Sequence, residues 1–104
     1  MTINFNAISW SGAQWAAVGE TGTIFISLNG LIWEKQQSGT EVELNGITWN
    51  RSDNEWIAVG GQGTVITSPN GVDWYAEDSG TTITLNDVHA FPTLRNQSIN
   101  IAVG

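Results

Sequence analysis

The sequence contains no cysteine and a single histidine, His89. Without cysteine the chain can form no disulfide and can use no thiolate in catalysis. A zinc site would have to combine His89 with carboxylates, so we expect neither a metal nor another cofactor. No stretch approaches the ~18 consecutive apolar residues of a membrane helix, and the N-terminal segment lacks the basic and apolar regions of a signal peptide. We therefore expect a soluble chain in an unspecified compartment.

Basic residues are also scarce. Three Lys and Arg residues stand against ten Asp and Glu residues, which gives a formal net charge of −7 at pH 7. A surface of this charge repels phosphate groups, so neither nucleic acid nor a membrane is an expected partner. The acidic residues are scattered along the chain and form no block, which is typical of a solvated surface.

What the sequence does contain is an internal repeat. The segment WAAVGETGTIFISLNGLIW at 15–33 aligns with WIAVGGQGTVITSPNGVDW at 56–74, with a constant offset of 41 residues. The segments that precede these blocks also align with each other, and the same pattern begins a third time near the end of the sequence. We infer two full repeats and the first half of a third, and their bounds are 5–43, 44–84 and 85–104.

Each full repeat predicts four short antiparallel strands. In the second repeat these are NGITW, EWIAVG, GTVITS and VDWYAE, which are rich in β-branched and aromatic residues. The pairs Asn29-Gly30 and Asn70-Gly71 lie between the third and fourth strands. Because Asn and Gly both tolerate positive φ, these pairs favour a two-residue type I′ hairpin. The tetrapeptides GETG and GGQG turn the second strand into the third.

Four antiparallel strands in each 41-residue repeat are typical of a β-propeller blade. The segment Gln36–Glu43 must then cross back over three strand spacings, about 14 Å in all, and it can reach roughly 26 Å. A compact β-sandwich is the main alternative, but it does not require the strands to recur at a fixed period. We therefore expect an all-β fold in which residues 1–104 form a single partial propeller domain.

The heptads SLNGLIW at 27–33 and SPNGVDW at 68–74 resemble the Asp-box (BNR-type) repeats of sialidase-like propellers. The whole unit is similar to the repeats of photosystem II assembly-factor-type propellers and of phage and bacterial surface proteins. Two features depart from the Asp box: Asn29 and Asn70 replace the Asp, and the heptad is one residue shorter. The resemblance implies that the heptad closes the outer hairpin of each blade, where Asn accepts backbone N–H bonds as Asp would.

Candidates for catalysis are few. The resemblance to sialidases implies an arginine cluster, a tyrosine nucleophile and an acid, whereas the chain has only Arg51, Arg95 and Tyr75, and Tyr75 falls on the predicted outer strand. His89 has no G-x-S-x-G partner motif, so a Ser-His-Asp site is not predicted. Any sialidase-like chemistry would therefore lack the required groups.

A glycosidase could instead use two carboxylates, for which Asp53, Glu55 and Asp87 are the candidates. Nothing in the sequence fixes their relative positions, and charged loop residues are most often simply solvated. We expect no catalytic residues and keep a glycosidase only as a third hypothesis.

The six tryptophans recur at equivalent positions in the two full repeats. This recurrence favours packing between neighbouring blades over a platform for stacking on sugars. The polar loops at 11–14, 50–55 and 92–100 differ in length, lie on one predicted rim, and are better candidates for ligand binding. The candidate ligand-binding residues in these loops are Arg51, Asp53, Glu55 and Arg95.

The sequence thus favours a non-catalytic binding module for a glycan or a protein surface. The alternative is a purely structural, oligomerising repeat of a phage or cell-surface protein. Closed propellers need about four to eight blades, and this chain supplies two full repeats and part of a third. Alone, it is expected to expose the Trp-rich flank of its first blade and the apolar edge of the segment INIAVG, and such surfaces favour partners. We therefore expect a homo-oligomer, in which a two-fold dimer is the commonest closed solution.

Overall fold

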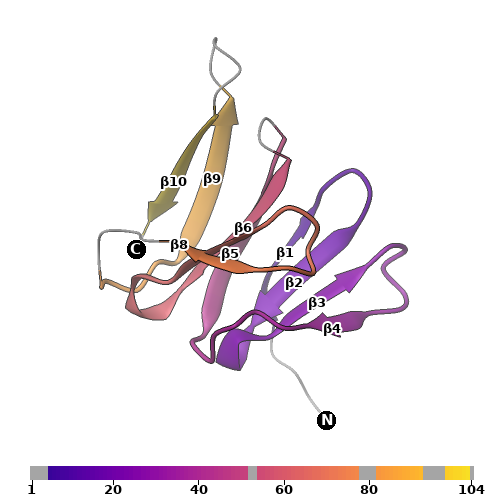
Figure 1. Ribbon diagram of the computed structural model, residues 1–104, viewed down its shortest axis with the longest axis horizontal. Helices are drawn as coiled ribbons and strands as arrows, with labels where there is room; N and C mark the ends of the chain where they lie inside the picture. The colour runs from indigo at the N-terminus through magenta and orange to yellow at the C-terminus, as the bar shows by residue number, and fades with distance from the viewer. Residues whose placement is uncertain (1–4, 52–53, 78–81, 93–97, 104) are drawn as a thin grey trace.

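The computed structural model describes residues 5–51, 54–77, 82–92 and 98–103. These residues contain three antiparallel sheets that follow one another along the chain (Figure 1). The first sheet has the order β1-β2-β3-β4, the second has the order β5-β6-β7-β8, and β9 and β10 form the third. The helical elements of the described ranges are two three-residue 3₁₀ turns, Glu20–Gly22 and Gly61–Gly63. The predicted all-β fold is confirmed.

The bounds of the strands follow the repeat. The first sheet comprises β1 (Phe5–Trp10), β2 (Trp15–Gly19), β3 (Ile24–Ser27) and β4 (Glu34–Gln36). The second comprises β5 (Leu44–Asn50), β6 (Glu55–Gly60), β7 (Val65–Ser68) and β8 (Tyr75–Glu77). The third comprises β9 (Asp87–Pro92) and β10 (Ser98–Val103).

The register of strand pairing repeats from sheet to sheet. Ala17 pairs with Ile8 in the first sheet, Ala58 pairs with Ile47 in the second, and Ala102 pairs with Val88 in the third. The alignment of the sequence repeats is therefore also an alignment of their backbones. A side chain at one position of a repeat can be compared directly with its counterpart in the next repeat.

The sheets pack face to face in an open series, and the first strands of successive sheets, β1, β5 and β9, pack against one another (Figure 1). One buried cluster joins the first and second sheets and contains Ala16, Val18 and Ile24 with Trp56 and Ile66. A second cluster joins the second and third sheets, and its members are Ile57, Val59, Leu85 and Val88. Burying each large side chain in these clusters contributes about 1.5–3 kcal/mol.

The turns from the second to the third strand form as predicted. In each of them one non-glycine residue is left-handed, Thr21 at φ 55° and Gln62 at φ 58°, and a left-handed glycine follows it. Gly22 also lies close to the chain of the next connection, because a Cβ atom there would stand 2.0 Å from the Thr40 carbonyl oxygen. Only glycine fits this position without moving the backbone.

The predicted two-residue type I′ hairpin is wrong. Six residues, 28–33, separate β3 from β4, and 69–74 likewise separate β7 from β8. Gly30 and Gly71 have positive φ values of 77° and 81°, but neither Asn does. The asparagine side chain closes the turn in place of a second left-handed residue. Consequently β8 contains only the last three residues of the predicted strand VDWYAE.

Candidate functional site

The heptad turns are held by their own side chains. In the first repeat, Ser27 Oγ accepts a hydrogen bond from the Gly30 N–H at 2.8 Å. Asn29 Oδ1 accepts from the N–H groups of Leu31 at 2.8 Å and Ile32 at 3.0 Å. The Trp33 indole N–H donates to the Gly30 carbonyl at 3.1 Å. These bonds serve turn geometry, as the resemblance implied.

The second heptad makes the same set of bonds and adds one to the neighbouring sheet. Ser68 Oγ accepts from the Gly71 N–H at 2.7 Å, and Asn70 Oδ1 accepts from the N–H groups of Val72 and Asp73 at 2.8 and 2.9 Å. The Trp74 indole N–H donates to the Gly71 carbonyl at 2.9 Å. In addition, Gln14 Nε2 of the first repeat donates to the Asn70 carbonyl at 3.0 Å. Each turn therefore reaches toward the preceding sheet, and the second turn finds the first sheet there.

Among the described residues, no sheet lies beside the first turn in the way that the first sheet lies beside the second turn. The apolar side chains of the first turn are open to solvent, and Leu31 is 83% exposed. Leu28 and Ile32 are similarly exposed. The two turns thus have one internal structure and two different environments.

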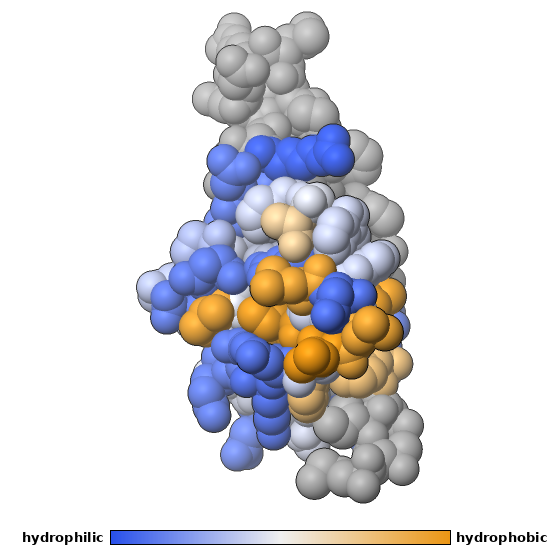
Figure 2. Space-filling view, turned by 90° about the vertical axis from the view of Figure 1, so that its right-hand side faces the viewer, coloured by the Kyte–Doolittle hydropathy of each residue, from blue (hydrophilic) through white to orange (hydrophobic). Residues whose placement is uncertain are grey.

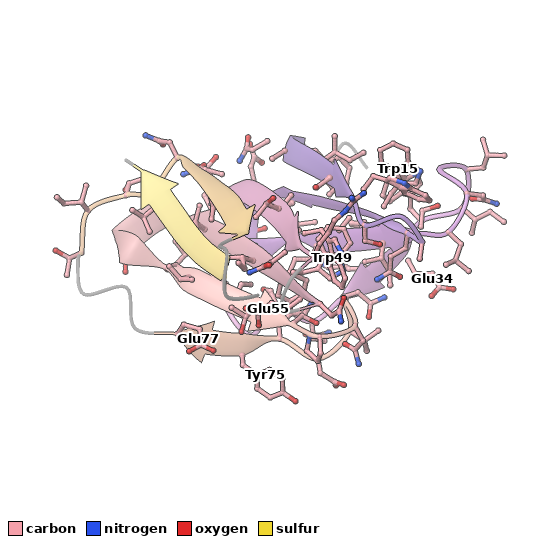
Figure 3. All side chains as sticks on the ribbon, turned by 90° about the horizontal axis from the view of Figure 1, so that it is seen from above. Trp15, Glu34, Trp49, Glu55, Tyr75 and Glu77 are labelled. Carbon is pink, nitrogen blue, oxygen red and sulfur yellow. The ribbon has the colours of Figure 1, made fainter. Side chains whose placement is uncertain are left out.

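The tryptophans show the same difference. Trp56 is fully buried, and Trp49 and Trp74 pack against the cluster between the first two sheets, as expected for packing between blades. Two of their counterparts in the first repeat are more open: Trp15 is half-buried and Trp10 is 45% exposed. Figure 3 shows Trp49 among the sheets and Trp15 toward the outer side of the first sheet.

The first sheet therefore presents an outer apolar surface, which we call the open face. It is defined by Phe5, Ile8, Trp10, Trp15, Phe25 and Trp33. Ile8 is 56% exposed, whereas its counterpart Ile47 is 7% exposed. A hollow of about 520 Å³ on this face is lined mainly by Phe5, Ile8, Phe25 and Trp33. Figure 2 shows hydrophobic residues gathered at the centre of this side of the molecule.

Aromatic contacts give the open face a defined shape. The rings of Phe5 and Phe25 meet edge to face, with their centroids 5.6 Å apart. Those of Trp10 and Trp15 lie 4.8 Å apart at an interplanar angle of 44°. The face offers aromatic surface and few polar groups. Such a surface is typical of contact with another apolar surface.

The predicted polar site is only partly within the described residues. Arg51 is exposed in the turn that follows β5, and Glu55 is half-buried at the start of β6 (Figure 3). Asp53 and Arg95 lie outside the described residues, as do the side chains of His89 and Asp87. A site formed by all four candidate residues therefore stays a prediction.

The remaining candidates are also apart from the open face. Tyr75 is exposed on β8 and points outward at the far edge of the second sheet (Figure 3). Across the described ranges, no three His, Cys, Asp or Glu side chains cluster so that they could hold a metal ion. No helix in the described part of the chain is long and apolar enough to cross a bilayer.

No protein-family model matches the chain, and no curated protein or solved structure matches it either. The resemblance to Asp-box propellers therefore stays a prediction. The sequence predicts an exposed Trp-rich flank on the first blade, and the open face agrees with that prediction. The matching patterns at Ile8 and Ile47 do not show which of the two is exposed, so the sequence does not single out Ile8.

Proposed function

We propose that the chain is a non-catalytic interaction module, built of propeller-type blades, that binds a protein surface through the open face. One observation supports this proposal above all. The positions that form the open face in the first repeat are, in the second repeat, the positions buried against a neighbouring sheet. A set of side chains that forms a packed interface once has the shape and polarity to form one again.

The energetics favour a protein partner over a small ligand. Exposed aromatic and aliphatic residues of this size contribute about 1.5–3 kcal/mol each when they are buried. Interfaces between proteins draw most of their binding energy from a few clustered residues, often aromatic ones. Trp10, Trp15 and Trp33 are residues of this kind on the open face. A contiguous apolar patch on a protein surface is typical of a binding site.

The second candidate function is a purely structural repeat that builds an appendage. It uses the same face and differs only in what that face binds. Binding of a glycan through Arg51 and Glu55 is a separate prediction, because these residues belong to the second sheet and its β5–β6 turn, whereas the open face belongs to the first sheet.

The experiment compares two single variants with the unmodified chain. Ile8→Asp places a charge on the open face, and Arg51→Ala removes the polar candidate; both residues are exposed, so both variants should fold. Individually purified protein partners and a glycan array are probed with all three chains. We expect protein binding that Ile8→Asp abolishes and Arg51→Ala leaves intact. Binding that survives Ile8→Asp but is lost with Arg51→Ala would contradict the proposal and support the polar loop.

A further inference from the structure

The two faces of a full sheet differ in the size of their side chains. The face of the second sheet that meets the first carries tryptophans, with Trp56 buried and Trp49 and Trp74 packed against the same cluster. The face of the first sheet that receives them carries aliphatic residues, including Ala16, Val18 and Ile24. We call these the aromatic face and the aliphatic face. In this chain the aromatic face of one sheet packs on the aliphatic face of the sheet before it.

This pairing is tight. Trp56, Ala16 and Val18 are all fully buried in the same cluster. A residue as small as Ala16 leaves room for an indole ring, and interiors of this kind are packed to crystal-like density. Two aromatic faces placed against each other would oppose large side chains to large side chains. Such overpacking costs about 1–3 kcal/mol for each misfit, so like faces do not pair well.

The open face is the aromatic face of the first sheet. We propose that it binds the third sheet of a second copy of this chain, head to tail. This inference rests on the proposed function and names its partner. Register supports the third sheet as the partner surface, because β10 pairs with β9 as β2 pairs with β1. Ile101 and Val103 occupy on β10 the positions that Ala16 and Val18 occupy on β2.

The heptad turn adds a second contact to this mode of docking. Within one chain, the turn at 68–74 reaches the first sheet through Gln14 and Ile26, both close to Gly71. In a head-to-tail assembly the equivalent turn at 27–33 reaches the second copy in the same way. The exposed Leu31 and Ile32 then gain a neighbour. The turn and the sheet face act together because they belong to the same side of the repeat.

Head-to-tail docking has a consequence that two-fold pairing lacks. It uses two different surfaces, so each added copy still has one of each surface free until a ring closes. The assembly therefore grows beyond two chains or closes as a ring. The two-fold dimer expected from the sequence uses one surface twice and stops at two.

The test uses the absence of native cysteine, because an introduced thiol is then the only one in the chain. One variant carries Ile8→Cys on the open face, and a second carries Ile101→Cys on β10. A third, Arg51→Cys, measures background at an exposed position away from the open face. Each variant alone, and each pairwise mixture, is treated with a short bismaleimide and analysed by mass.

We expect the Ile8→Cys and Ile101→Cys mixture to give a dimeric product at least tenfold above the Arg51→Cys background. Efficient crosslinking of Ile8→Cys with itself would overturn the proposal in favour of two-fold pairing. A mixture no better than background would also overturn it. Sedimentation of the unmodified chain supplies the second readout, and Ile8→Asp should raise its dissociation constant by at least about tenfold.

The two proposals fail in different ways. If the chain stays monomeric but another protein binds it in an Ile8-dependent manner, the second copy is the wrong partner and the interaction function stands. If no Ile8-dependent binding of any protein is found and the chain stays monomeric, both proposals fail. Circular dichroism of Ile8→Asp confirms that a loss of association is not a loss of fold.

Discussion

The first and second repeats have similar sequences and the same strand register, yet the aromatic face of the second is covered and that of the first is not. Ile47 is buried and Ile8 is exposed. The heptad turn at 68–74 contacts a neighbouring sheet through Gln14 and Ile26, whereas Gly30 of the turn at 27–33 lies beside Trp15 of its own sheet. Local sequence determines the strands and turns of each repeat, and the neighbour determines what is buried. The following predictions test this comparison.

The largest difference should come from the paired tryptophans. Trp56→Ala should lower the free energy of unfolding by about 3–5 kcal/mol, because it leaves a cavity in the buried cluster. Trp15→Ala, at the matched position, should cost less than half as much in a dilute sample, because Trp15 is only half-buried. Urea titration of both variants gives the two values. Equal losses would mean that the open face is covered in solution even at low concentration.

The second difference should appear at the turn glycines. Both Gly30 and Gly71 have positive φ, so alanine strains the backbone at either position. At Gly71 the added Cβ would also lie 2.9 Å from Gln14 Nε2 and 3.4 Å from Ile26 Cγ2, whereas at Gly30 the nearest atom is 3.7 Å away. We expect Gly71→Ala to cost about 1–2 kcal/mol more than Gly30→Ala, measured by thermal or urea unfolding. An identical cost would show that contact between the sheets at this turn is unimportant.

The third comparison concerns Asn29 and Asn70, the two turn asparagines of the heptads. Asn70 Nδ2 donates to Asp73 Oδ2 at 3.0 Å, whereas residue 32, the counterpart of Asp73, is an isoleucine. Asn70→Asp therefore sets two carboxylates together and should cost about 0.5–1 kcal/mol at neutral pH. Asn29→Asp should be near neutral, because its Oδ1 contacts are kept.

The pH dependence gives a check on this third prediction. Repulsion between the two carboxylates raises a pKa in the folded Asn70→Asp variant relative to its unfolded value. The cost is therefore absent below the unfolded pKa and appears in full as pH rises through the raised folded pKa. Unfolding measured at acidic and neutral pH should bring the Asn70→Asp and Asn29→Asp variants together at the acidic end. A difference that persists there has another cause.

The smallest effect should come from salt. Each copy carries a formal net charge of −7, so association through an apolar face must overcome repulsion between the copies. Added sodium chloride screens this repulsion and should tighten self-association several-fold, as measured by sedimentation velocity. Association that weakens with salt would point instead to ion pairs at the interface and away from the open face.

Much of the fold could be predicted from the sequence. The segment EWIAVG is continuously apolar after its first residue and forms β6 with the predicted bounds. The GETG and GGQG turns also form at the positions predicted from their glycines. The Asn-Gly hairpin could not be predicted correctly, because the choice between backbone φ and a side-chain hydrogen bond depends on Ser27 and Ser68 as well. Both serines accept from a turn N–H.

The candidate site could be predicted less well. Ile8 and Ile47 are the same residue in the same pattern, so no local signal tells which of them has a neighbour. Charged loop residues such as Arg51 are predicted as binding residues because of their charge. The residues of the open face are apolar, and apolar residues are predicted to be buried in the core. Only the arrangement of the sheets separates core from exposed surface.

The heptad turn is held by hydrogen bonds from its own side chains, and this affects how readily whole repeats can be added to the chain or lost from it. Ser27, Asn29 and Trp33 satisfy the turn from within, so the turn forms these bonds without the sheet beside it. A duplicated repeat would bring its own turns ready to fold, and the bonds to be matched anew are those between repeats, such as Gln14 to Asn70, Asn6 to Leu44 and Asn45 to Leu85. A gene could therefore gain or lose whole 41-residue units in single recombination events and still encode a folded chain.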